Sequence, residues 1–298
     1  MRRGHKTAVE RRNGSGLTAR ETLVKSLREE PKRGDVSDSR ASREPRKTLT
    51  IVVPCYNERA TILQVVARVR KLPIDKLVVV VDNCSTDGTR ELLQSVCCKE
   101  EALLPSEPLT PGAESIAAQR RMDGDGFVLV LQSRNTGKGT SFRTALGLAN
   151  SDYVICQDAD LEYNPEDIAR LVDHAKRFGS AAVFGSRLRE TGRWKTDAFH
   201  IGRIALTKLF RVLYNSKITD VATCYKLMKT DVARGLHLES SGFDLDFEIP
   251  AKLMRGKVNI AELPIGYSPR SRSQGKKIGW RHGFLAVWTL LKFRVGHR

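Results

Sequence analysis

The chain has 298 residues, 40% of them hydrophobic and 29% charged, a composition typical of a globular protein with room for one large α/β domain. Its formal net charge of +17 favours anionic partners, such as phosphorylated ligands, acidic membrane surfaces or nucleic acid. No apolar stretch reaches the roughly 18 residues of a membrane-spanning helix, and no apolar run follows the basic first residues. We therefore expect neither a spanning helix nor a secretory signal.

Residues 1–47 differ from the rest of the chain. They carry 14 Lys or Arg against 7 Asp or Glu, and they show no sustained apolar periodicity. Such a composition cannot bury enough apolar surface to offset the entropy of folding. We expect a disordered basic tail over 1–47 and a folded domain over 48–298.

The six cysteines show no spacing typical of metal ligands. Cys55, Cys84 and Cys156 lie at the ends of predicted buried strands, where a reduced thiol behaves as a small apolar side chain. We expect free thiols and a cytoplasmic protein.

The first elements after the tail alternate between strand and helix. Apolar runs at 49–53 and 77–81 predict strands, and helical spacing predicts helices over 58–71 and 89–96. The strands are continuously apolar rather than alternating, which indicates a parallel sheet covered on both faces.

Residues 97–126 interrupt this rhythm with three prolines and a Gly/Asp cluster, and predict a long loop. The alternation then resumes. Strands are expected at 127–131, 153–157 and 181–184, and helices at 140–149 and 166–177. The order of elements predicts an α/β, Rossmann-like fold with a mostly parallel sheet.

The last third is predicted to hold two amphipathic helices, over 199–214 and 280–293, around a segment of short strands with a helix near 246–255. The apolar stripes of the two helices have two interpretations. They pack against the domain, or Trp280, Phe284 and Trp288 lie in the headgroup region of an acidic membrane.

Polar side chains follow three predicted strands: Asn57 and Glu58, then Asp82, then Asp158 and Asp160. Ligands of open α/β sheets bind at the carboxyl ends of the strands, so neighbouring strands would bring these groups into one crevice. Asp158 and Asp160 are two residues apart and point the same way in extended chain. Their carboxylates suit Mg²⁺ or Mn²⁺ placed between them and a phosphate.

The turn at 137–140, Gly-Lys-Gly-Thr, does not match a P-loop. That motif needs Ser or Thr directly after the Lys and a Gly five residues before it, and Gly139 and Ser133 occupy those positions. Two interpretations of Lys138 stay open, a contact to a donor phosphate at a helix N-terminus and simple turn chemistry.

Seven motifs lie in order at 50–58, 81–89, 135–139, 157–161, 185–187, 220–226 and 275–280. The first four resemble the motifs of glycosyltransferase family 2, and the last three resemble its dolichol-phosphate mannose synthase-like branch. The similarity covers about residues 48–294. Asn83 and Cys84 stand where many relatives have Asp-Asp or Asp-Gly, which places the fine donor contacts in doubt.

The resemblance implies a GT-A fold and an inverting transfer from a nucleotide-sugar. It implies donor contacts from Pro54, Tyr56, Asn57, Glu58, Val80, Asp82, Lys138, Asp158, Ala159 and Asp160. It also implies a divalent ion held by Asp158, Asp160 and Glu162.

The same resemblance places Arg187, Arg203 and Lys277 near the acceptor and donor phosphates, and these three join Asp160 as candidate catalytic residues. The implied acceptor is a polyprenyl phosphate, with GDP-mannose as the leading donor and UDP-glucose as the second. Several relatives have transmembrane helices that this sequence does not show after residue 294, so we expect any membrane attachment to be peripheral, on the cytoplasmic face.

The acceptor stays open on chemical grounds. A phosphate monoester, with a second pKa of about 6, is ionised at neutral pH and needs positioning cations rather than a base. A hydroxyl acceptor would need a carboxylate base, for which Asp244, Asp246 and Glu248 are candidates.

Three other classes of protein are alternatives to a glycosyltransferase. A nucleotidyltransferase is disfavoured because Pro-Cys-Tyr-Asn-Glu follows the first strand in place of a Gly-rich basic signature. A non-catalytic nucleic-acid-binding protein is compatible with the net charge, but no binding motif is evident and only 6% of residues are aromatic, so we expect no specific nucleic-acid partner. The intact Asp158 and Asp160 argue against an inactive relative.

Overall fold

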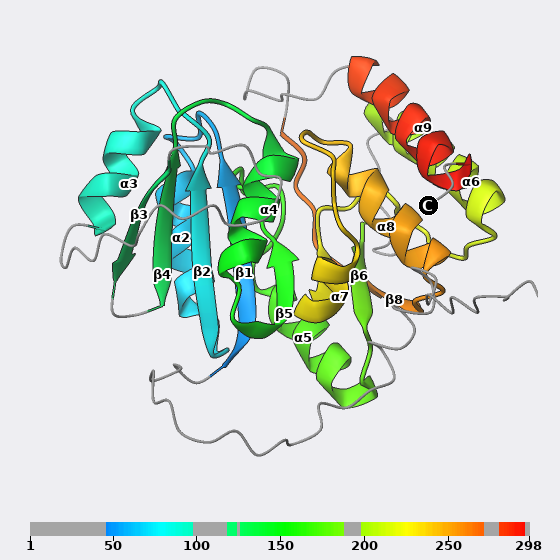
Figure 1. Ribbon diagram of the computed structural model, residues 1–298, viewed down its shortest axis with the longest axis horizontal. Coiled ribbons are helices and arrows are strands. Elements are labelled where there is room, and N and C mark those ends of the chain that lie inside the picture. Colours follow the sequence, from blue (N-terminus) through cyan, green and yellow to red (C-terminus); the bar gives the residue numbers. More distant parts are fainter. Residues whose placement is uncertain (1–45, 98–117, 124–125, 188–197, 271–279, 296–298) are drawn as a thin grey trace, which may run out of the picture. The chain divides into compact units, whose positions relative to one another are not determined.

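A computed structural model of the protein describes residues 46–97, 118–123, 126–187, 198–270 and 280–295 (Figure 1). Most of the predicted tail and the candidate Lys277 lie outside these ranges. The domain boundary at residue 47 stays a prediction, although Lys47 already begins the first strand. None of the helices in the described ranges is long and apolar enough to cross a bilayer.

An eight-stranded sheet in these ranges has the order β3-β4-β2-β1-β5-β7-β6-β8. Its strands are β1 (Lys47–Cys55), β2 (Lys76–Asp82), β3 (Ala118–Asp123), β4 (Phe127–Gln132), β5 (Ser151–Cys156), β6 (Ala182–Ser186), β7 (Lys226–Lys229) and β8 (Ile260–Pro264). The pairs β1–β2, β1–β5, β2–β4 and β6–β8 are parallel, and β3 and β7 pair antiparallel with their neighbours. The predicted mostly parallel sheet is confirmed.

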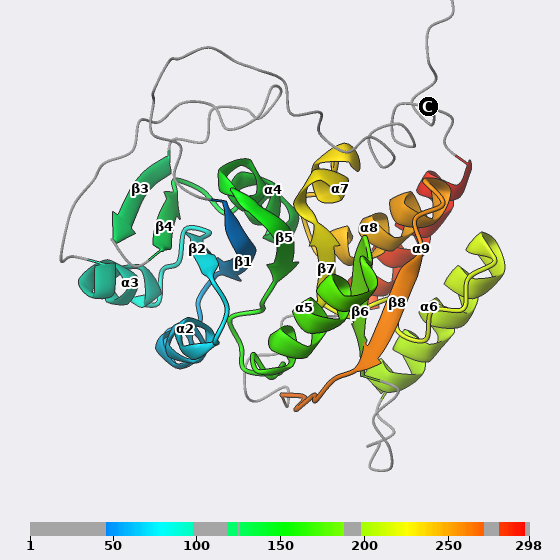
Figure 2. The same cartoon turned by 90° about the horizontal axis from the view of Figure 1, so that it is seen from below.

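Helices cover both faces of the sheet, as predicted (Figure 2). They are α2 (Ile62–Lys71), α3 (Thr89–Cys97), α4 (Lys138–Leu148), α5 (Asp167–Phe178), α6 (Ala198–Tyr214), α7 (Thr230–Gly235), α8 (Leu245–Arg255) and α9 (Trp280–Val295). In Figure 2, α2, α3 and α5 lie on one face, and α4, α7 and α8 on the other. The amphipathic helix α9 packs against α8 and α6.

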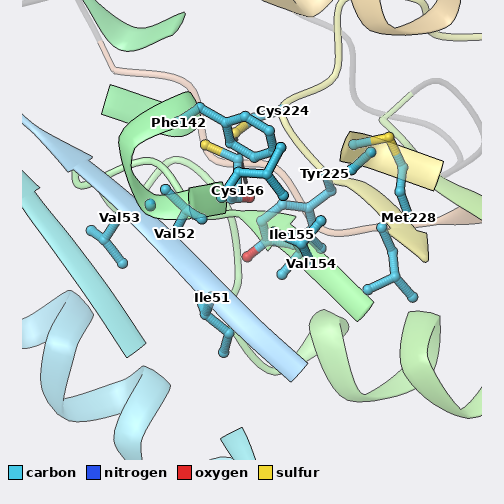
Figure 3. Close-up of a cluster of buried hydrophobic side chains, with 14 of the residues drawn as sticks. Ile51, Val52, Val53, Phe142, Val154, Ile155, Cys156, Cys224, Tyr225 and Met228 are labelled. Carbon is cyan, nitrogen blue, oxygen red and sulfur yellow. Dashed lines mark hydrogen bonds between the residues drawn. The ribbon is translucent and has the colours of Figure 1, made fainter. Parts of the chain in front are cut away.

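The core is centred on β1 and β5, the middle strands of the sheet. Ile51, Val52 and Ile155 have no exposed surface, because helices cover both sides of these strands. Phe142 of α4 packs close to Cys156 and Cys224 (Figure 3). The branched side chains that predicted a two-faced sheet therefore form its interior.

The prediction of a loop over 97–126 was wrong for the C-terminal part of that range. Residues 118–123 form the edge strand β3, antiparallel to β4. Their sequence, Ala-Gln-Arg-Arg-Met-Asp, carries no apolar run, because a strand at a sheet edge has only one neighbour and is commonly polar. Residues 98–117, with the three prolines, lie outside the described ranges.

Candidate active site

A cavity of about 220 Å³ opens beside the carboxyl ends of β1 and β5. Nine predicted site residues line it: Pro54, Tyr56, Glu58, Lys138, Asp158, Ala159, Asp160, Glu162 and Arg187. The strand ends therefore converge as the rule for open α/β sheets requires.

Four other predicted residues are described but do not line this cavity: Asn57, Val80, Asp82 and Arg203. Asp82 is fully buried and accepts a hydrogen bond from Arg90 Nε at 2.7 Å, and Val80 belongs to the core of β2. The Asn57 side chain accepts from the Thr86 amide at 2.8 Å and so ties two strand-end loops together. In this structure these three residues support the cavity from outside.

One side of the cavity is organised by Lys138. Its ammonium lies 3.0 Å from Asp158 Oδ1 and 3.1 Å from Asp246 Oδ2, and Lys226 lies 3.6 Å from the other oxygen of Asp246. Burial opposes the charge on Lys138, yet Asp158 and Asp246 hold its pKa well above the usual value. Burial likewise opposes the charge on Asp158, and Lys138 lowers its pKa. The four side chains form a row of alternating charge, with the two lysines buried and the two aspartates partly buried.

The glycines beside Lys138 are needed for packing. A Cβ on Gly139 would lie 2.2 Å from the Ser240 carbonyl oxygen, and one on Gly137 2.4 Å from that of Ser241. The amides of Gly139 and Thr140 both donate to Ser241 O, so the start of α4 is already occupied by protein. The structure favours turn packing over a phosphate cradle for this motif.

The opposite side of the cavity is organised by Arg270, which the sequence did not reveal. Its guanidinium donates to Glu58 Oε2 at 3.0 Å and to Asp160 Oδ2 at 2.9 Å. Its Nε lies 3.7 Å from Glu162 Oε1. One cation thus joins carboxylates that follow two different strands.

The segment that carries Arg270 is fastened to the end of β5. Tyr267 Oη donates to Glu162 Oε2 at 2.7 Å, and the Arg270 amide donates to Glu162 Oε1 at 3.0 Å. The Tyr267 ring packs edge-on against Tyr163, and the same two residues form an isolated β-bridge. These contacts place Glu162 beneath Arg270.

The acidic groups of the cavity have the charge that a divalent cation needs, but they are divided between two cations of the protein itself, Lys138 and Arg270. Burial, then the nearby charges of Asp158 and Glu162, raise the pKa of Asp160 to about 7, a crowding that a cation would relieve. However, Asp158 turns to Lys138, while Asp160 and Glu162 share Arg270. The predicted trio of metal ligands therefore lines the cavity without closing on one point.

A different trio does come together in the described part of the chain. The thiols of Cys156 and Cys224 and a carboxylate oxygen of Asp158 lie within 4.8 Å of one another. The Lys138 ammonium is 3.5 Å from Cys224 Sγ, and burial raises the pKa of that thiol well above its usual value. An ammonium and a protonated thiol both disfavour a metal there.

Arg187 is held in a fixed orientation. Its Nε and Nη2 donate to Asp220 at 2.7 and 2.9 Å, and its guanidinium stacks over Tyr163 and Tyr267. Burial opposes the charge, but Asp220 holds the pKa of Arg187 well above its usual value. Arg203 reaches the same ring of Tyr267 from α6, outside the cavity lining. The structure thus brings two of the three predicted basic residues together around Tyr267.

The three candidate bases occupy different places. Glu248 is fully buried and accepts from the amides of Glu239 and Ser240, while Asp244 Oδ1 accepts from the Gly242 amide. These two carboxylates shape the loop before α8. Asp246 alone of the three lines the cavity.

Two asparagines also line the cavity, and the sequence analysis did not predict that they contact each other. Asn83 Nδ2 donates to Asn135 Oδ1 at 2.9 Å, and Asn83 Oδ1 accepts from the Thr136 amide. The departure from the family pattern at Asn83 was the signal that could have found it. Its partner across the fold was beyond sequence reasoning.

The model of glycosyl transferase family 2 matches residues 50–101 and 108–236. The chain belongs to glycosyltransferase family 2. The names of its curated relatives include a hexosyltransferase and a mannosyltransferase.

Among curated relatives, the glycosyltransferase is 24% identical over 266 residues to an undecaprenyl-phosphate mannosyltransferase of Micrococcus luteus, covering 84% of this chain and 99% of that one. It is 26% identical over 246 residues to a dolichol-phosphate mannosyltransferase of Pyrococcus furiosus, covering 78% and 59%. It is 25% identical to the low-salt glycan biosynthesis hexosyltransferase Agl6 of Haloferax volcanii, covering 79% of this chain. The chain spans only 52% of the length of Agl6.

Among solved structures, the glycosyltransferase is similar to glucosyl-3-phosphoglycerate synthase from Mycobacterium tuberculosis in complex with Mn²⁺, UDP and phosphoglyceric acid. The TM-score is 0.57 at 17% identity, and the match covers 95% of this chain and 84% of that one. This likeness shows the fold, which is GT-A, as the sequence motifs implied.

Proposed function

We propose that this glycosyltransferase transfers a hexose, with inversion, from a nucleoside diphosphate sugar to a polyprenyl phosphate, with the help of Mg²⁺ or Mn²⁺. GDP-mannose is the leading donor and UDP-glucose the second. The names of two relatives, which act on undecaprenyl and dolichol phosphate, support the acceptor class.

One observation carries the choice of a phosphate acceptor. Every carboxylate in the described lining is paired with Lys138 or Arg270: Glu58, Asp158, Asp160, Glu162 and Asp246. Asp246, the remaining candidate base, is held by two ammonium groups and would lose ion pairs on taking a proton. An ionised phosphate acceptor needs no such base.

The reaction then proceeds by displacement. A phosphate oxygen of the acceptor attacks the anomeric carbon, the bond to the diphosphate breaks, and its electron pair leaves with the nucleoside diphosphate, so no proton moves. Pro54, Tyr56 and Glu58 bind the nucleoside, and Arg187 orients the acceptor phosphate while Asp220 holds its other edge. Asp158, Asp160 and Glu162 would hold the divalent ion, which would supply positive charge to neutralise the departing diphosphate.

The helices α6 and α9 suit contact with the surface that carries such an acceptor. Leu290 and Phe293 of α9 are buried, whereas Phe284, Trp288 and Val295 are 71%, 64% and 72% exposed. Neither helix contains Asp or Glu, and both carry Lys and Arg. We propose peripheral binding to an acidic membrane on its cytoplasmic face, through the exposed side of α9.

The acceptor is tested by supplying labelled GDP-mannose or UDP-glucose with Mn²⁺ and either polyprenyl phosphate or the free polyprenol. We expect a glycolipid phosphate product with the phosphate only, and none with Asp160→Asn, whose folding is checked by circular dichroism. Transfer to the polyprenol at a comparable rate would replace the proposal with a hydroxyl-acceptor enzyme.

Membrane contact has its own test. Trp288→Ser should weaken sedimentation with vesicles that contain anionic lipid several-fold, because the indole no longer enters the headgroup region. The control is Phe178→Ser, which removes a 62% exposed ring from α5. Equal binding by the wild type and both variants would place the membrane contact elsewhere or nowhere.

A further inference from the structure

The guanidinium of Arg270 occupies the part of the cavity where positive charge is wanted. It contacts Glu58 with two nitrogens, at 3.0 and 3.2 Å, and Asp160 at 2.9 Å, and its Nε lies 3.7 Å from Glu162. Two of these three carboxylates, those of Asp160 and Glu162, are also proposed metal ligands, together with Asp158. Arg270 therefore neutralises the same groups that a divalent ion would neutralise.

The oxygens of Asp160 leave little room for both cations. Oδ2 accepts from Arg270, and Oδ1 accepts from the Glu162 amide at 3.1 Å. Mg²⁺ and Mn²⁺ bind carboxylate oxygens at about 2 Å, so an ion on Asp160 would lie within roughly 5 Å of the guanidinium. At that separation two positive charges in a partly buried site repel strongly.

Of the two resident cations, Arg270 is the one placed to leave. Lys138 is 8% exposed and is gripped by Asp158 and Asp246, the second of which also pairs with Lys226. The Arg270 side chain is 17% exposed, and no carboxylate outside the proposed donor and metal site holds it in the described structure.

We propose that Arg270 is a resident counter-cation that competes with the divalent metal for Asp160 and Glu162. Without a donor, Arg270 keeps the two carboxylates apart from Asp158, and the protein binds metal weakly. Metal that arrives with the donor diphosphate displaces the guanidinium, so the metal site is fully occupied only when the donor is present. This inference rests on the proposed metal-dependent function.

The test is Mn²⁺ binding in the absence of nucleotide, measured from the electron paramagnetic resonance signal of free Mn²⁺. Arg270→Gln should bind Mn²⁺ at least about tenfold more tightly than the wild type, because a repelling charge is gone. Arg270→Lys should fall between the two. The matched control is Arg68→Gln, which removes a guanidinium paired with Glu166 outside the cavity lining and should leave Mn²⁺ affinity unchanged.

Two results would overturn the proposal. If Arg270→Gln binds Mn²⁺ no more tightly than the wild type while the wild type still binds Mn²⁺ with GDP or UDP, the competition is wrong and the metal-dependent function stands. If the wild type binds no Mn²⁺ even with a nucleotide, both the competition and the metal-dependent function fail. Adding Asp160→Asn to Arg270→Gln should abolish the gained affinity, and a gain that survives would locate the ion away from Asp160.

Discussion

The two sides of the cavity solve the same electrostatic problem in different ways. On one side Lys138 lies in a row with Asp158, Asp246 and Lys226, in which every charge has a partner inside the protein. On the other side a single guanidinium, that of Arg270, contacts three carboxylates of the cavity. The first arrangement is saturated, and the second has more negative than positive charge.

The difference suggests a division of labour. A row in which every charge is paired is costly to disturb, because removing one partner leaves the opposite charge unmatched in a largely buried setting. A cluster with more negative than positive charge can exchange one cation for another. We infer that the Lys138 side is structural and that the Arg270 side responds to ligands.

The largest expected effect comes from breaking the saturated side. Lys138→Met should lower the free energy of unfolding by about 3 kcal/mol, because Asp158 and Asp246 both lose the ammonium group that lies between them. Urea unfolding followed by circular dichroism measures this loss. The double variant Lys138→Met/Asp158→Asn should recover part of it, and a loss under about 1 kcal/mol would contradict the structural role.

A smaller effect is expected on the responsive side. Arg270→Met should lower the free energy of unfolding by about 1 kcal/mol in metal-free buffer, because Asp160, whose pKa burial and neighbouring charges raise to about 7, can take up a proton when the guanidinium is lost. Mn²⁺ should restore the loss in this variant and not in Lys138→Met. Restoration of both variants, or of neither, would remove the distinction between the two sides.

The sequence predicted the half of the fold that its hydrophobic pattern determines. Strands β1, β2, β4 and β5 each contain a continuous apolar run, and such a run is typical of a strand that is buried on both faces. The cluster Asp158 to Glu162 was placed correctly at the cavity for the same reason, since it follows such a strand. Strand β3 is polar, and its pairing depends on backbone hydrogen bonds to β4, which the pattern cannot indicate.

The rest of the site depends on contacts between distant segments. Arg270 is more than 100 residues from Asp160 in the chain, and it reaches Asp160 only because Tyr267 and Glu162 fasten its segment beside β5. Sequence reasoning could name Lys138 but not its partner Asp246, 108 residues away. Asp82 is a different case: its side chain pairs with Arg90 and does not line the cavity, and its contact with the donor stays a prediction.

The most direct test of the account is nucleotide binding at the carboxylate cluster. The thermal stability of the wild type and of Asp160→Ala is measured with GDP, UDP and their sugars, each with and without Mn²⁺. We predict a stabilisation of the wild type by one nucleotide family that requires Mn²⁺ and is absent in Asp160→Ala. If no nucleotide stabilises the wild type with any divalent metal, the donor-site assignment is wrong.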